Sequence, residues 1–254
     1  MKSQFRSLPN SFVLLAPFCG NVRSVTPLLE VIVCSVADAI EAERGGANRL
    51  EIVRDLHQGG LTPSRELVSE IKQAVELPVR VMLRESAGYQ TNGPDEIDRL
   101  CRAAAAFAAL EVDGVVLGFL NGAAVDLELT ERVLACAPQV RATFHHAFED
   151  AGDKLRALSD IKRLPQVDRI LSSGGTDNLR LRVQRLAEYE RAAAPELTIL
   201  AGGGIDGDAI VQIKRETRIR EFHVGRAARL NFQVDGAVQA SLVSSLVQKL
   251  VSAD

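Results

Sequence analysis

Four ionisable side chains stand at or near the ends of short apolar segments: Glu51, Arg84, His145 and His223. Carboxylates and imidazoles are the groups that most often act as general acids and bases, and they also bind divalent metals. An unpaired carboxylate inside an apolar segment is costly, so Glu51 needs a partner or a chemical role. We therefore expect these four residues to form a catalytic site, with Glu51 as a general base or a metal ligand beside the two histidines.

A structural interpretation of the same residues stays open. Glu51 could form an ion pair with an inward-pointing arginine such as Arg84. A single histidine is more often a hydrogen-bonded structural residue than a functional one. His146, directly after His145, and the pair Ser172-Ser173 also follow apolar segments, and the serines equally suit a helix cap.

Two glycine-containing segments predict an anion site. Residues 201–205 read Ala-Gly-Gly-Gly-Ile, and residues 224–227 read Val-Gly-Arg-Ala. Glycine lets backbone N–H groups approach an anion closely, and an arginine can pair with it through two hydrogen bonds. The expected anion-binding residues are Gly203, Gly204, Gly225 and Arg226. The alternative is that the glycines only make tight turns, while Asp206 and Asp208 cap the next helix and repel an anion.

The elements that must position these residues alternate regularly between strand and helix. Short β-branched or aliphatic runs recur roughly every 25 residues, and each is followed by a helical segment. They lie at 29–33, 49–53, 79–83, 114–117, 140–144, 168–171, 197–200 and 221–224. Eight such units close an eightfold β/α (TIM) barrel, which typically needs about 250 residues and carries its site where the strands end. The chemistry-bearing residues stand at those ends.

Length and composition agree with one α/β domain. The chain has 254 residues, of which 46% are hydrophobic and 25% charged, and no Pro-, Ser- or charge-rich linker divides it. We expect an N-terminal extension over 1–27 and the barrel over 28–254. The apolar run 12–16 faintly resembles a signal peptide, but Pro17 interrupts it and no small-x-small cleavage site follows, so a cytoplasmic location is expected.

Charge and cysteine content exclude several classes of partner. The net charge of −3 and the 4% aromatic content give no basic or stacking surface for nucleic acid and none for an acidic membrane. The four cysteines, Cys19, Cys34, Cys101 and Cys136, are widely spaced and form no CxxC pair. Reduced thiols are expected, rather than a zinc knuckle or a disulfide framework.

Several motifs in order resemble the CutC copper-homeostasis family over about residues 29–229. They are the segments 43–51 (Glu-Arg-Gly-Gly-Ala-Asn-Arg-Leu-Glu), 59–64, 78–84, 143–148, 200–205 and 221–223. The resemblance implies a cytoplasmic eightfold barrel, commonly a homodimer or a higher homo-oligomer, associated with copper tolerance and with copper as a bound ion. It also implies an enzyme-like cleft at Glu51, Arg84, His145 and His223.

The departures from the family pattern concern the metal. Members usually have one cysteine in the first strand and another after the glutamate of the second, where this chain has Ile32 and Val53. Thiolates are the natural ligands of Cu(I), and the nearby Cys34 supplies only one. The chain resembles a divergent member in which the cleft is retained better than the thiols.

Three hypotheses about function follow. The first is a copper-homeostasis protein that binds copper or another divalent metal in the cytoplasm. The second is an enzyme that acts on a small anionic or polyol substrate by acid–base or metal-assisted chemistry. The third is a non-catalytic scaffold barrel. The expected partners are a metal ion or a small molecule, together with further copies of the chain.

Overall fold

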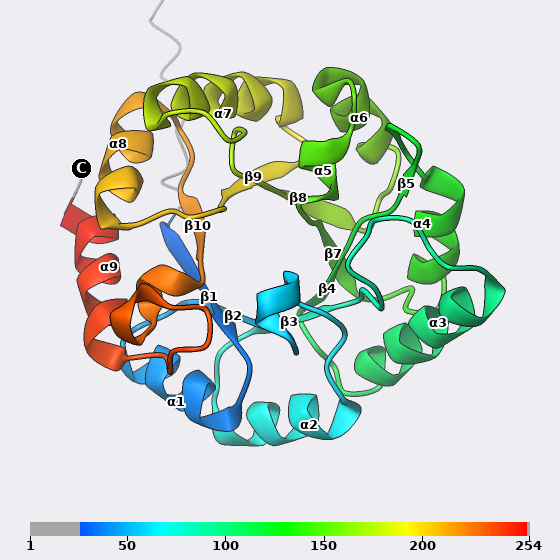
Figure 1. Ribbon diagram of the computed structural model, residues 1–254, viewed down its shortest axis with the longest axis horizontal. Coiled ribbons are helices and arrows are strands. Elements are labelled where there is room, and N and C mark those ends of the chain that lie inside the picture. The colour runs from blue at the N-terminus through cyan, green and yellow to red at the C-terminus, as the bar shows by residue number, and fades with distance from the viewer. Residues whose placement is uncertain (1–25, 253–254) are drawn as a thin grey trace, which may run out of the picture.

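The computed structural model describes residues 26–252, and eight parallel strands within them close into a barrel (Figure 1). The strand order around the barrel is β1-β10-β9-β8-β7-β4-β3-β2, so the first and last strands are neighbours. The strands are β1 (Leu28–Val33), β2 (Arg49–Ile52), β3 (Val79–Met82), β4 (Gly114–Leu117), β7 (Arg141–Phe144), β8 (Val167–Ser172), β9 (Thr198–Ala201) and β10 (Glu221–Val224). The predicted TIM barrel is confirmed.

Helices form a ring around the strands (Figure 1). The helices that follow the barrel strands are α1 (Val36–Arg44), α2 (Arg65–Ala74), α3 (Pro94–Ala108), α4 (Leu127–Leu134), α6 (Lys154–Ile161), α7 (Leu179–Ala193), α8 (Gly207–Glu216) and α9 (Ala240–Ser252). Ser35 caps α1 by accepting a hydrogen bond from the Asp38 N–H. Asn178 and Asp206 cap α7 and α8 in the same way. Within residues 26–252, no helix is long and apolar enough to cross a membrane.

Short elements that the sequence pattern did not predict occupy several loops. The hairpin of β5 (Leu120–Asn121) and β6 (Ala124–Val125) follows β4, and the single turn α5 (Ala147–Asp150) follows β7. Three short 3-10 helices, η1 (Leu56–Gln58), η2 (Arg226–Ala228) and η3 (Leu230–Phe232), lie in the loops after β2 and β10. The last helix, α9, begins only after these turns, at Ala240. Residues 1–25 of the expected extension lie outside the described residues.

The two sides of the barrel wall differ in character. Leu29, Val31, Leu50 and Ile52 are fully buried and belong to the aliphatic core. At alternate positions the barrel strands carry charged residues whose side chains form ion pairs across the barrel interior. Arg80 on β3, for example, contacts Asp168 on β8, although β4 and β7 lie between those strands. The alternation of a strand thus sends aliphatic groups outward and charged groups inward.

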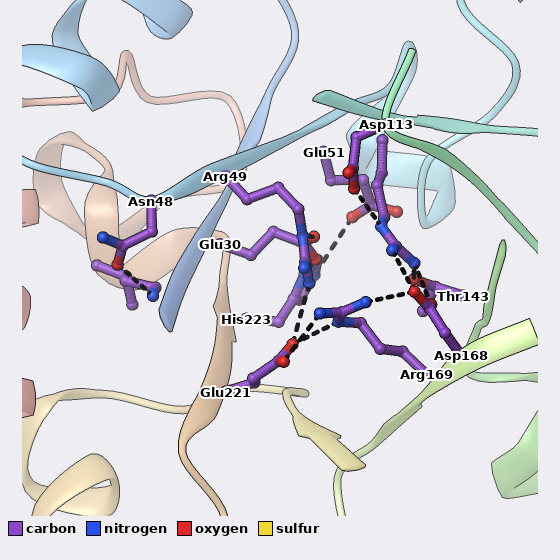
Figure 2. A network of polar contacts seen from close by, with 12 residues as sticks. Glu30, Asn48, Arg49, Glu51, Asp113, Thr143, Asp168, Arg169, Glu221 and His223 are labelled. Carbon is purple, nitrogen blue, oxygen red and sulfur yellow. Dashed lines mark hydrogen bonds and ion pairs between the residues drawn. The ribbon is translucent and has the colours of Figure 1, made fainter. Parts of the chain in front are cut away.

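A chain of ion pairs with alternating sign fills that interior (Figure 2). Arg49 links Glu30 (2.5 Å) to Glu221 (3.4 Å), and Arg169 binds the same Glu221 at 2.5 Å. Arg169 then contacts Asp168, and Asp168 contacts Arg80, which also binds Asp113 and Thr143. The register shift between β7 and β8 places Val167 opposite Ala142 but Arg169 opposite Thr143, which makes Asp168 the extra residue of a bulge. The bulge explains how two consecutive residues both reach this network.

Replacing Arg49 by methionine is expected to lower the free energy of unfolding by about 3–5 kcal/mol, because it leaves two buried carboxylates without their shared partner. Arg49 is 3% exposed at its side chain. The matched control is Arg44→Met, whose ion pair with Glu41 lies on the surface with 70% of the arginine side chain exposed, and which should change stability by less than about 1 kcal/mol. Urea unfolding measures both. Equal effects of the two substitutions would contradict the importance given to the interior network.

Candidate functional site

A cavity of about 650 Å³ opens where the barrel strands end in their loops. All eight residues singled out in the sequence line it: Glu51, Arg84, His145, His223, Gly203, Gly204, Gly225 and Arg226. They come from five different strands or the loops that follow them, and the barrel brings them to one place because the carboxyl ends of its parallel strands all face the same way.

His223, which lines the cavity, stands between two carboxylates (Figure 2). Its Nδ1 lies 2.7 Å from Oε1 of Glu30, and its Nε2 lies 3.4 Å from Oε2 of Glu51. The register of β1 against β10 pairs Glu30 with His223, so the closure of the barrel produces the first contact. Glu30 is also held by Arg49, which joins the site to the interior ion pairs. The imidazole is therefore fixed in orientation, with Nε2 directed at Glu51.

The three groups of this cluster have shifted pKa values. Burial raises the pKa of Glu51 to about 7, although the charge of His223 opposes the shift. Burial would raise the pKa of Glu30 too, but Arg49 and His223 outweigh it and hold that pKa far below its ordinary value. For His223, burial lowers the pKa, and the carboxylates of Glu51 and Glu30 reverse the effect and raise it. Glu30 is thus held in its ionised form, whereas the pKa values of both Glu51 and His223 are raised.

One oxygen of Glu51 has no partner. Oε1 is buried and accepts no hydrogen bond from any residue in the described part of the chain, while Oε2 faces His223. An unsatisfied buried carboxylate oxygen is rare, and the residue that carries this one lines the cavity. The alternative of an ion pair between Glu51 and Arg84 is not what forms, because the ion-pair partner of Glu51 is His223.

Arg84 joins two loops by hydrogen bonds to backbone carbonyls. Its guanidinium donates to the carbonyls of Gly59 (3.2 Å), Gly60 (3.4 Å) and Gly88 (3.4 Å), and also to that of Ala87. The same group lies 5.1 Å from the ring centre of Tyr89, a cation–π distance. Because carbonyls are neutral, these contacts leave a positive charge at the wall of the cavity.

The two adjacent histidines are neutral groups. Burial, with the charges of Arg84 and His146, lowers the pKa of His145 to about 3. Burial and the charge of His223 lower the pKa of His146 to about 4. Nδ1 of His145 accepts a hydrogen bond from the N–H of Ala147 at 3.2 Å, which assigns the remaining proton to Nε2. His145 is thus an uncharged N–H donor beside the cavity.

The glycine loop after β9 exposes backbone donors. Gly203 and Gly204 have φ of 76° and 72°, the left-handed conformation that glycine adopts without strain. Within residues 26–252, neither N–H group has a hydrogen-bond partner. A Cβ placed on Gly204 would lie 3.7 Å from Nη2 of Arg226, so the guanidinium is close to the loop. Asp206 caps α8 and lines the cavity too, whereas Asp208 pairs with Lys249.

Sequence reasoning missed Glu30 and Tyr89. Glu30 has a signal that could have found it, since it interrupts an apolar strand as Glu51 does, and the inward positions of other strands carry Arg49, Arg80 and Glu221. Tyr89 lies in a loop without any periodic pattern, and nothing in the sequence distinguishes it. Ser172 and Ser173 bind the carboxylate of Glu149 rather than capping α7.

Apart from the thioether of Met82, the side chains that line the cavity offer no soft ligand for Cu(I). Ile32 and Val53, at the positions where the family resemblance implies cysteines, both line the cavity and pack in one apolar cluster. Cys34 accepts a hydrogen bond from Arg229 at 3.7 Å, and burial raises its pKa. The atoms that converge, one each from Glu30, Glu51 and His223, lie within 4.8 Å of one another and are oxygen and nitrogen. Such donors suit harder divalent cations rather than a soft monovalent one.

The fold and the cavity together define a single-domain TIM barrel with a polar site at the carboxyl ends of its strands. Residues 27–228 match the model of the CutC family, and the chain belongs to that family. It is 32% identical over 196 residues to the family protein CutC of Xylella fastidiosa (strain Temecula1), covering 77% of this chain and 73% of that one. It is 34% identical over 204 residues to the human copper homeostasis protein cutC homolog, covering 77% and 72%.

Solved structures agree with the fold. The putative copper homeostasis protein CutC of Streptococcus agalactiae has a TM-score of 0.72 with 24% identity, over 78% of this chain and 98% of that one. A phosphoribosylanthranilate isomerase from Thermotoga maritima, 10% identical, has a TM-score of 0.59 over 89% of this chain and 99% of that one. At these identities the likeness concerns the barrel alone.

Glu51→Gln is expected to change how stability depends on pH. Folding raises the pKa of Glu51 to about 7, so the unfolded chain ionises first and the free energy of unfolding falls as the pH rises from about 4.5 towards 7. The raised pKa of His223 acts in the same direction, because its stabilisation is present at low pH and lost as the pH rises. Glutamine removes the first effect and weakens the second.

The difference in unfolding free energy, wild type minus Glu51→Gln, should therefore fall between pH 5 and pH 8 by on the order of 1–3 kcal/mol. Urea unfolding at the two pH values measures it, with Glu188→Gln on the exposed side of α7 as the control. Parallel pH profiles for wild type and Glu51→Gln would contradict the raised pKa.

Proposed function

We propose that the cavity is the active site of an enzyme that transfers protons to and from a small anionic molecule, with Glu51 as the acid–base group. The observation that carries the proposal is the unpartnered Oε1 of Glu51, buried in the cavity wall on a carboxyl group with a pKa near 7. A general acid–base group works best when its pKa is close to the working pH and its reacting atom is free.

Glu30 and His223 support Glu51 in this role. Glu30, kept ionised by Arg49, accepts a hydrogen bond from Nδ1 of His223 and so fixes the orientation of the ring. The opposite nitrogen, Nε2, faces Oε2 of Glu51. The imidazole can therefore give up a proton, and with it its positive charge, when Glu51 takes up a proton at Oε1. Glu30 and His223 together thus allow Glu51 to cycle between its two protonation states.

Donor groups in the loops after β9 and β10 would hold the anion. The free N–H groups of Gly203 and Gly204 and the guanidinium of Arg226 form an anion-binding corner close to the start of α8, where the helix dipole also favours negative charge. His145 and Arg84 add an N–H donor and a positive charge to the wall. These donors suit polarisation of a carbonyl or hydroxyl oxygen of the substrate as Glu51 moves a proton.

Binding of a divalent metal by Glu30, Glu51 and His223 is the second candidate function. Their ligand atoms lie close enough together for one ion, and relatives carry names that refer to copper homeostasis. An ion there would displace the proton shared by His223 and Glu51 and would compete with Arg49 for Glu30. The two candidates use the same residues, so the test must separate them.

Exchange of carbon-bound hydrogen for solvent deuterium tests the proton-transfer role without knowledge of the complete reaction. Dihydroxyacetone phosphate and glycolaldehyde phosphate serve as small anionic probes with an acidic C–H, and NMR follows deuterium uptake in D₂O. The wild type should accelerate exchange, and Glu51→Gln should lose about 10²–10⁴-fold of that acceleration. Glu188→Gln should keep it.

A chelator separates the two candidates in the same assay. Exchange that survives dialysis against EDTA supports proton transfer by Glu51 alone. Exchange that disappears and returns with Zn²⁺ or Mn²⁺ favours the metal. A folded Glu51→Gln protein with undiminished exchange would refute the role given to Glu51.

Arg226→Ala should weaken the binding of phosphate or sulfate by about 1.5–3 kcal/mol, the usual contribution of a hydrogen bond to a charged group. Isothermal calorimetry measures the change, with Arg215→Ala as the control, since Arg215 lies in the last turn of α8 and pairs with Glu216. Absence of phosphate binding in the unmodified protein would remove the anion corner from the proposal.

A further inference from the structure

One part of the cavity wall is apolar and takes no part in the proposed proton transfer. Four side chains from β1, β3 and the segment after β2 pack in one apolar cluster that lines the cavity: Ile32, Val53, Leu56 and Met82. The cavity volume of about 650 Å³ lies within the range of sites that hold drug-sized ligands. A three-carbon anion held by the loops after β9 and β10 would leave this apolar cluster unused.

The alternation of the barrel strands produces the apolar cluster. Glu30 and Arg80 point into the barrel interior, where they form ion pairs. Ile32 and Met82 lie two positions further along the same strands, so they point inward as well, one layer nearer the carboxyl ends. On this side of the barrel the inward layer therefore changes from charged to apolar just where the cavity begins. Apolar side chains at such a place recognise an apolar part of a ligand.

Phe232 adds an exposed aromatic ring to the same cavity. It lines the cavity, yet 62% of the residue is exposed to solvent. Its φ of 56°, like that of Asn231, lies in the left-handed region, which is a rare conformation for a bulky residue. Strain of this kind persists only where the surrounding structure enforces it, and it concentrates at ligand-binding sites.

The loop that carries Phe232 is anchored at its base by a buried arginine. Arg229 donates to the carbonyls of Gly236 (2.7 Å) and Ile32 (3.0 Å), and it pairs with Asp38 at 3.2 Å. The N–H of Phe232 in turn donates to the carbonyl of Arg229 at 3.0 Å. Because Ile32 belongs to the apolar cluster, the same arginine ties the loop to that part of the wall. The backbone beneath the ring is fixed, and the ring is presented to the cavity instead of the core.

We propose that Phe232 and the apolar cluster bind an aromatic ring of the substrate, while the anion corner binds its anionic group. This inference rests on the proposed function for the anionic half of the ligand and adds the ring to it. Aromatic rings attract each other beyond the area that they bury, and no other aromatic ring in residues 26–252 stacks on Phe232. Phe232 is thus a specificity-determining residue that favours aryl anions over small ones.

The experiment compares benzyl phosphate with methyl phosphate, in which a hydrogen atom replaces the phenyl group, in NMR titrations of the full chain. Binding of either ester requires no proton transfer, so the measurement is independent of the acid–base role of Glu51. The wild type should bind benzyl phosphate about 10- to 100-fold more tightly, because the ring buries apolar area. Phe232→Ala should reduce that ratio about 3- to 10-fold and leave the affinity for methyl phosphate unchanged.

Three further variants locate the ring. Arg226→Ala should weaken the binding of both esters alike and keep their ratio, because the phosphate is common to both. Leu155→Ala, which removes an exposed apolar side chain from α6, should change neither affinity. Phe232→Gly should lose the ring preference as Phe232→Ala does, and it should be at least as stable to urea as that variant, since glycine adopts a φ of 56° without strain.

Equal affinities of the wild type for the two esters would overturn the inference, and so would a folded Phe232→Ala protein that keeps the full preference for benzyl phosphate. Both results leave the proposed function standing, because methyl phosphate still binds and the deuterium-exchange probes carry no ring. A ring preference that depends on Phe232 supports the inference whether or not Glu51→Gln loses deuterium exchange. Binding of neither ester would overturn the inference together with the anion corner.

Discussion

The contact between Arg49 and Glu30 is the interaction on which the interior of this barrel depends. Burying a charged group costs several kcal/mol, and the cost is offset only when each charge meets an opposite one in good geometry. Arg49 satisfies two carboxylates at once, Glu30 and Glu221. Through Glu221 it reaches the ionic chain on one side, and through Glu30 it reaches His223 on the other. The structural network and the candidate site are therefore parts of one electrostatic system.

This coupling explains the unusual state of Glu51. Arg49 keeps Glu30 ionised, Glu30 orients His223, and His223 occupies one oxygen of Glu51 and leaves the other free. The anion corner made by Gly203, Gly204 and Arg226 belongs to the same cavity. One cavity thus holds both the residues of the proposed anion corner and a carboxyl group whose pKa is raised by burial.

Membership of the CutC family relates this chain to proteins named for copper homeostasis. In this member, Ile32 and Val53 line the cavity at the two positions where the family resemblance implies cysteines. Thiolates, the natural ligands of Cu(I), are therefore missing from these two positions.

The sequence by itself determined the eight strand–helix units, the barrel and the cavity-lining positions of Glu51 and His223. These features follow from local periodicity and from the rule that such folds carry their sites at the ends of strands. The tertiary structure alone decided the partners. Glu51 faces His223 rather than Arg84, and Glu30 joins them, because closing the barrel pairs the first strand with the last. Residues 30 and 223 are 193 positions apart, and no local pattern carries information about a contact made only when the ring of strands closes.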